Sequence, residues 1–75
     1  MDRALLSQHL VQAEQHVSLC ERHVYRQRAL VEHLAIVGND TGQAECLLQE
    51  FEQMLLMFTA DRDRVRAELA RFDRG

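Results

Sequence analysis

The segment Gly38-Asn39-Asp40-Thr41-Gly42 decides the fold of this chain of 75 residues, because it divides two long helical patterns. Gly38 lacks a Cβ atom, so it can adopt the left-handed conformation that ends a helix. Asp40 or Thr41 can then cap a second helix by accepting hydrogen bonds from its first backbone N–H groups. A connection this short predicts that the two helices fold back on each other in antiparallel orientation.

Outward from this turn, residues recur at alternating steps of four and three, which keeps them on one side of a helix. We label them positions a and d of a heptad abcdefg. Before the turn they are Leu6, Leu10, Ala13, Val17, Cys20, Val24, Gln27, Val31 and Leu34. After the turn they are Ala44, Leu48, Phe51, Leu55, Phe58, Arg62, Val65, Leu69 and Phe72. No proline interrupts either half, so we expect helices over about residues 2–37 and 41–73, a turn at 38–41, and Asp2 as the first cap.

These patterns predict an all-α fold, a single coiled-coil-like antiparallel hairpin. Two helices bury only the stripes that face each other, and here the apolar stripe is wider than one hairpin needs. Leu30 and Val37 widen it before the turn, and Leu47 and Met54 widen it after the turn, all at g positions. We therefore expect two copies to form a homodimer, a four-helix bundle.

The charges argue against nucleic acid as a partner. The formal net charge is −3, and the nine basic residues, all arginine, are interleaved with acids, as in Asp61-Arg62-Asp63-Arg64. Nucleic-acid binding favours a basic stripe instead. The chain opens without a signal-peptide pattern, and its apolar runs are far shorter than the ~20 residues that cross a bilayer. We expect no membrane partner and a cytoplasmic location.

The two cysteines fit a reducing compartment. In the predicted hairpin, Cys20 is expected opposite a residue near Thr59, and Cys46 opposite a residue near His33, which places the sulfurs about 20 Å apart by helical rise. A disulfide needs Cα atoms within about 7 Å, so the two thiols of one hairpin are expected to stay reduced.

One group of residues resembles a metal site. His9, His16 and His23 recur at heptad spacing in position g, and Cys20 falls between the last two. Side chains three or four residues apart on a helix are neighbours, so His16, Cys20 and His23 are candidate ligands for zinc, with Asp61 or Asp63 completing the set from the other helix. In the alternative interpretation, Cys20 is a small core residue and the histidines flank the seam. We favour the second and expect no cofactor.

Two polar residues occupy seam positions. Arg62 at an a position needs a compensating charge or an outward path for its guanidinium, and Glu14 or Glu21 is the expected partner. Gln27 at a d position is a milder case of the same kind. Polar residues at such positions can fix the register or the oligomeric state of a coiled coil.

A partner is suggested by apolar residues that the seam does not explain. They lie at positions b, c and f: Leu5, Val11, Leu19, Tyr25, Ile36, Leu56 and Met57. The segment Met54-Leu55-Leu56-Met57-Phe58 is apolar around its whole helix, so it is expected to be covered on more than one side. We predict an interaction surface at Met54, Leu56 and Met57. It binds a second copy or another protein.

Several short strings resemble a group of short proteobacterial helical proteins to which no activity has been assigned. They are Ala13-Glu14-Gln15-His16-Val17, Glu21-Arg22-His23-Val24, Arg26-Gln27-Arg28, Asp40-Thr41, Leu47-Leu48, Phe51-Glu52 and Asp61-Arg62-Asp63-Arg64-Val65. The resemblance covers nearly the whole chain and implies a bacterial source. Cys20 departs from it, because that group has a small residue there.

No catalytic or nucleotide-binding motif is present in the sequence, so we expect that the protein is not an enzyme. The predicted function is non-catalytic protein interaction as a scaffold, adaptor or small regulator. The alternative is a metal-binding helical bundle that uses His16, Cys20 and His23.

Overall fold

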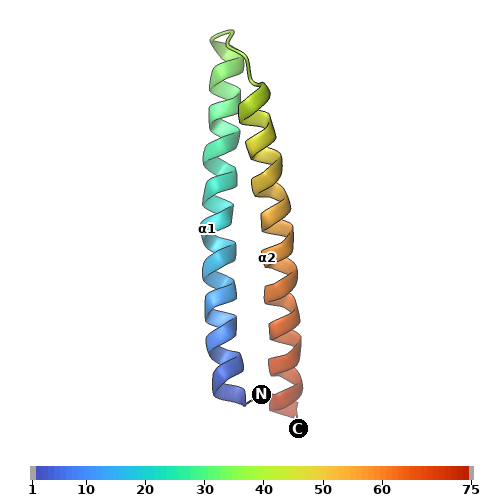
Figure 1. Ribbon diagram of the computed structural model, residues 1–75. Helices are drawn as coiled ribbons and strands as arrows, with labels where there is room; N and C mark the ends of the chain where they lie inside the picture. Colours follow the sequence, from blue (N-terminus) through green and yellow to red (C-terminus); the bar gives the residue numbers. More distant parts are fainter. Residues whose placement is uncertain (1, 75) are drawn as a thin grey trace.

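The computed structural model describes residues 2–74 and consists of two long helices that lie side by side (Figure 1). Helix α1 is Arg3–Ile36 and helix α2 is Gly42–Arg74. The two helices run antiparallel and form a rod of 58 × 15 × 14 Å. The predicted all-α antiparallel hairpin is therefore confirmed. Neither helix is long and apolar enough to cross a membrane.

The turn begins with a glycine-dependent end to α1. Gly38 has φ of +79°, and a Cβ atom would be strained in that conformation. Its N–H donates to the Ala35 carbonyl oxygen at 3.2 Å, while the Asn39 N–H donates to the Leu34 carbonyl oxygen at 2.9 Å. This pair of bonds is a Schellman motif, which satisfies carbonyl groups that the helix end would otherwise leave unpaired.

Side chains and carbonyl groups cap the starts of both helices. The Asp2 carboxylate accepts from the Leu5 N–H at 2.8 Å, as expected for the first N-cap. At the start of α2, two residues accept hydrogen bonds from helix N–H groups. The Asp40 carboxylate accepts from the Gly42 N–H at 2.9 Å, and the Thr41 carbonyl accepts from the Glu45 N–H at 2.8 Å. Of the two candidates that the sequence left open, Asp40 accepts a helix N–H with its side chain, whereas Thr41 contributes only its main-chain carbonyl, which accepts the first i→i+4 bond of α2.

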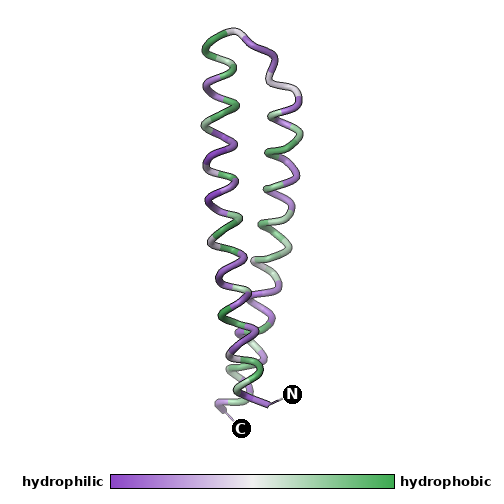
Figure 2. Tube along the Cα trace, turned by 60° about the vertical axis from the view of Figure 1, so that its left-hand side comes forward, coloured by the Kyte–Doolittle hydropathy of each residue, from purple (hydrophilic) through white to green (hydrophobic). Residues whose placement is uncertain are grey.

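The seam packs small residues of α1 beneath large residues of α2. Six α1 side chains are buried, Leu6, Ala13, Val17, Cys20, Val24 and Gln27, whereas on α2 only Val65 is buried among the described residues. The large α2 residues at seam positions, including Phe51, Leu55 and Phe58, are only half-buried. Figure 2 shows the hydrophobic segments recurring along both helices between hydrophilic ones. The hairpin therefore covers α1 more completely than α2.

Phe72 is an exception to the predicted seam, since 48% of its surface is exposed. It lies in the last turn of α2, at the open end of the hairpin, where α1 begins at Arg3 and offers little to pack against.

The axial register differs from the one expected for Cys20. Ring contacts between His16 and Phe58 and between His23 and Phe51 show that Cys20 lies level with Met54, more than one helical turn from Thr59. The expectation assumed a symmetric connection. Instead, the chain descends from the end of α1 before α2 begins (Figure 1), and this shifts α2 toward the open end.

Candidate functional site

The two helices form two flanks of different chemistry on either side of the seam. Residues at e positions of both helices meet on one side, which we call the ionic flank. There Arg66 pairs with Glu14 at 3.0 Å and Arg28 pairs with Glu52 at 3.2 Å, each from one helix to the other. All four side chains are 42–59% exposed, so each pair adds little stability.

The opposite side collects the apolar residues that the hairpin leaves uncovered. We call it the apolar flank and define it by positions g and c of both helices. Among residues 2–74, seven of the twelve large apolar side chains that stay exposed lie there: Leu5, Leu19, Leu30, Val37, Leu47, Met54 and Met57. Only Val11, Tyr25 and Leu56 lie at b positions, on the side of the ionic flank. The uncovered apolar surface is thus concentrated on one face of the hairpin.

A shallow groove of about 160 Å³ lies in the middle of the apolar flank. Its lining comes from both helices and consists of His16, Leu19, Cys20, His23, Met54 and Phe58. The His16 ring lies 5.1 Å from the Phe58 ring, tilted by 42°, and the His23 ring stacks at 5.2 Å on Phe51. The rings of His16, His23 and Phe58 therefore form part of the lining of the groove.

The structure brings the candidate metal ligands His16, Cys20 and His23 to this same groove, yet each has another contact. The histidine rings pack on phenylalanine rings, and the Cys20 thiol donates to the Phe51 carbonyl oxygen at a sulfur–oxygen distance of 3.4 Å. Among the described residues, no three or more His, Cys, Asp or Glu side chains are grouped so that they could hold a metal ion.

Burial also affects the chemistry of Cys20. Its relative exposure is 2%, and desolvation raises the pKa of its thiol. Metals bind the thiolate, so a raised pKa opposes ligation by this residue. Both cysteines are free, and Cys46 is exposed on the outer face of α2.

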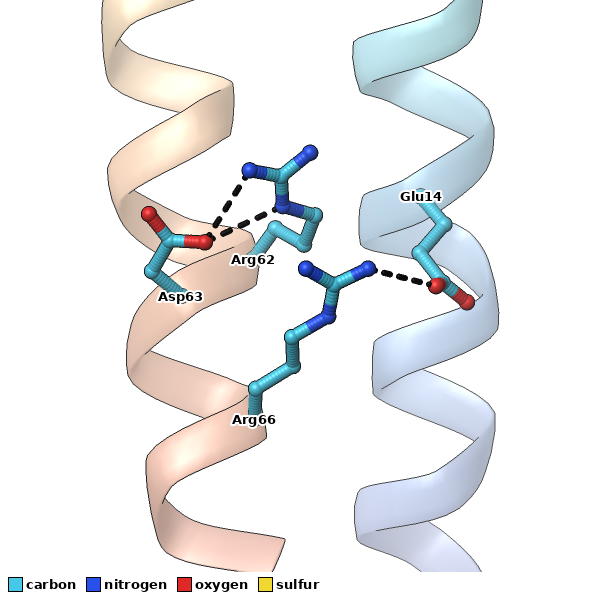
Figure 3. A network of polar contacts seen from close by, with 4 residues as sticks. All are labelled: Glu14, Arg62, Asp63 and Arg66. Atoms are coloured by element: carbon cyan, nitrogen blue, oxygen red, sulfur yellow. Dashed lines mark hydrogen bonds and ion pairs between the residues drawn. The ribbon is translucent and has the colours of Figure 1, made fainter.

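Arg62, a polar seam residue, pairs with a different residue from the one expected. Its guanidinium pairs with Asp63 on its own helix, with both N–O distances at 3.1 Å, whereas Glu14 pairs with Arg66 (Figure 3). The prediction that Arg62 pairs with Glu14 or Glu21 is therefore wrong. The physical reason is that Arg62 extends out of the seam along its aliphatic stem, and 24% of its side chain reaches solvent. Arg66 and Glu14 are both at e positions, where antiparallel helices place facing charges.

Gln27 is satisfied inside the seam. It is only 8% exposed, and its side-chain N–H donates to the Ala44 carbonyl oxygen at 2.9 Å. This bond joins α1 to the first turn of α2, close to the connection. It therefore ties one specific level of α1 to one specific level of α2, as expected for a register-fixing residue.

The structure separates the three residues of the predicted interaction surface. Met54 lines the groove, and Met57 follows it by three residues on the same flank. Leu56 instead lies four residues after Glu52, on the side of the ionic flank. Leu56 is at position b and Met57 at position c, and these positions differ by 100° around a helix. The heptad assignment therefore already indicated that the two side chains lie on different sides.

Two other depressions are less suited to a ligand or partner. One, of about 360 Å³, is lined by Ser7, Gln8, Val11 and Gln12, all from α1, so it has only one wall. The other, of about 300 Å³, is lined by Leu6, Glu68, Arg71 and Phe72 at the open end. Both helices also line the depression at the open end, but its lining includes a carboxylate and a guanidinium, whereas the lining of the groove of the apolar flank includes neither.

Comparisons with protein-family models, with curated proteins and with solved structures found no match to this chain. The resemblance to short proteobacterial helical proteins therefore stays a prediction.

Proposed function

We propose that this chain is a non-catalytic interaction protein that works as a homo-oligomeric helical bundle, serving as a scaffold, adaptor or small regulator. The observation that supports the proposal is the one-sided distribution of uncovered apolar residues. Scattered apolar residues are ordinary on a protein surface, but apolar residues gathered on one face mark a surface that another protein covers.

The packing of the hairpin supports the same conclusion. The large seam residues of α2 stay half-buried after α1 has packed against them, and only Val65 of α2 is buried among the described residues. A second hairpin placed on the apolar flank covers these same side chains. Four-helix bundles bury positions a, d and g in this way.

The face that carries the apolar flank is large enough for a stable dimer when the two copies overlap along their whole length. One entire face of the rod, 58 × 15 Å, corresponds to roughly 870 Å², close to the ~800 Å² per partner of a standard interface. Self-association also supplies core that two helices alone do not provide, since small single-core domains are marginally stable.

The alternative function is metal binding by His16, Cys20 and His23. It is favoured by one observation, that these residues line the same groove. The raised pKa of the Cys20 thiol and the packing of both histidine rings on phenylalanine oppose it.

Light scattering coupled to size-exclusion chromatography tests the proposal. A dimer is expected at about 17 kDa, twice the 8.7 kDa of the chain, at micromolar concentration and without an affinity tag. A mass of one chain across the whole micromolar range contradicts self-association.

A further inference from the structure

We propose that the apolar flank binds the same flank of a second copy of this chain, with both turns at the same end of the bundle. This inference rests on the proposed self-association and adds the orientation of the two copies, which follows from how charge is distributed along the flank.

The apolar flank changes character along its length. Its g positions near the turn are Leu30, Leu47 and Met54, whereas those toward the open end are His9, Asp61 and Glu68. Asp61 and Glu68 both pair with Arg64, which lies at a c position of the same flank. At the g positions, the half near the turn is therefore mainly apolar and the half near the open end mainly polar or charged, whereas the c positions are mixed, with Arg26 and Glu50 near the turn and Leu5 toward the open end.

The ring contacts within one hairpin establish which residues of α1 and α2 lie level, because His16 contacts Phe58 and His23 contacts Phe51. A two-fold axis parallel to the rod places α1 of one copy beside α2 of the second copy at these same levels. Each g position of α1 then lies nearest to one g position of α2 of the second copy, offset by about 5 Å at 1.5 Å of rise per residue, and the histidines lie about 6 Å from the next.

Every one of these pairs is chemically compatible. Near the turn, Leu30 faces Leu47 of the second copy, and His23 faces Met54. Toward the open end, His16 faces Asp61 of the second copy, and His9 faces Glu68. Imidazole rings can donate hydrogen bonds to carboxylates, so the charged half gains partners across the interface while the apolar half is desolvated.

The opposed arrangement, with the turn of one copy at the open end of the other, is unfavourable. It places each α2 beside the α2 of the second copy in reverse, so that Asp61 faces Met54 and Glu68 faces Leu47. Carboxylates would then be desolvated against apolar side chains without a donor from the second copy. At full overlap this difference favours the parallel arrangement, and an opposed dimer that pairs only its apolar halves avoids the mismatch but buries less of the face.

Pulsed electron paramagnetic resonance of spin-labelled protein tests the orientation. The background is Cys20→Ala with Cys46→Ala, and a single label is attached at Asn39→Cys in the turn or at Ala70→Cys near the open end. Both sites are exposed, and Ala70 is at a b position, away from the apolar flank. Each labelled variant is first shown by light scattering to keep the mass of the unlabelled protein.

With the turns together, both labels are expected to give distances below about 30 Å, because helices in a bundle lie only 8–10 Å apart. A fully overlapped opposed dimer gives about 50 Å for the turn label and about 40 Å for the open-end label at 1.5 Å per residue. An opposed dimer that overlaps only through the apolar halves shortens the turn distance and lengthens the open-end distance. A dimer that gives the distances of either opposed arrangement overturns the proposed orientation but not self-association. A monomeric mass overturns both proposals.

A matched pair of substitutions checks that the dimer uses the apolar flank. Met54→Glu is expected to abolish both short distances, because it places a carboxylate in the groove. Gln53→Glu, an exposed neighbour on the outer face of α2, is expected to leave them unchanged. Short distances that survive Met54→Glu show that another face associates, and they overturn the assignment.

Discussion

The adjacent residues Leu56 and Met57 provide a sharp test of which face of the hairpin associates. They are similarly exposed, at 72% and 66% of their surface, and they lie on α2 only one residue apart. Met57 is on the apolar flank and Leu56 on the side of the ionic flank. The same substitution, to glutamate, therefore has different expected effects at the two positions.

The magnitude for Met57→Glu follows from the area still available for burial. Complete burial of a methionine side chain stabilises by roughly 1.5–3 kcal/mol, and about two thirds of Met57 remains uncovered in the hairpin, which gives about 1–2 kcal/mol per copy. A symmetric dimer contains the site twice, so about 2–4 kcal/mol of association free energy is lost. At 1.4 kcal/mol per factor of ten, the dissociation constant rises roughly 30- to 700-fold, before any cost of desolvating the new carboxylate. Leu56→Glu is expected to change it by less than about fivefold, as surface substitutions usually stay within ±0.5 kcal/mol and the dimer contains the site twice.

Sedimentation equilibrium over a range of concentrations measures both dissociation constants, and circular dichroism at the highest concentration checks that helicity is retained. Equal weakening by the two substitutions, or weakening by Leu56→Glu alone, refutes the division into an apolar and an ionic flank.

Three further results are expected. Cys20→Ala should lower stability by about 1 kcal/mol, the usual cost of a methyl-sized cavity, without changing the metal content found by elemental analysis of untagged protein. Loss of stoichiometric metal together with a large fall in melting temperature would support the metal-binding alternative. Phe58→Ala should lower the free energy of unfolding by about 2–4 kcal/mol in urea titrations at fixed protein concentration, and clearly more than Phe72→Ala, which removes a ring already 48% exposed; equal losses would contradict the described seam. Arg3 donates to the Asp73 carboxylate at 2.6 Å and lowers its pKa, so Arg3→Gln should raise that pKa toward its usual value in an NMR titration. Because the folded-state pKa is the lowered one, the stability contributed by this pair is present at neutral pH and is lost as the pH falls through that pKa, where wild type and variant should converge. An unchanged Asp73 pKa in the variant would disprove the contact.

The heptad pattern was sufficient to predict the hairpin, since a repeat of four and three residues specifies which face of each helix is buried. It was insufficient for the axial level of Cys20 relative to α2. That level depends on the path of the connection after Gly38. A heptad pattern does not indicate how far the chain runs toward the open end before the next helix begins. Angular position is encoded locally, whereas axial offset is a property of the turn.

The candidate site shows the same division. Met54 and Met57 could be placed on one face from their g and c positions, and Leu56 could have been separated from them by the same rule. The partner of Arg62 could not be predicted from burial alone, because the outward path of its stem depends on the surrounding packing. The flank on which Glu14 and Arg66 meet, by contrast, follows from their e positions once the helices are known to be antiparallel, although the choice of Arg66 among the e residues of α2 again depends on the axial register.

The unequal sizes of the seam residues have a consequence for how the two helices recognise each other. At seam positions α1 carries the small buried residues Ala13, Val17 and Cys20, whereas α2 carries the half-buried rings of Phe51 and Phe58. Two copies of α1 paired with each other would enclose voids, and two copies of α2 would crowd their rings, and both mismatches cost free energy. Each helix is thus the complement of the other and a poor complement of itself. If the chain were cut between Asn39 and Asp40, each fragment would be expected to pair with the other fragment in preference to a second copy of itself. In the intact chain, the turn acts as a tether that raises the local concentration of each helix around the other.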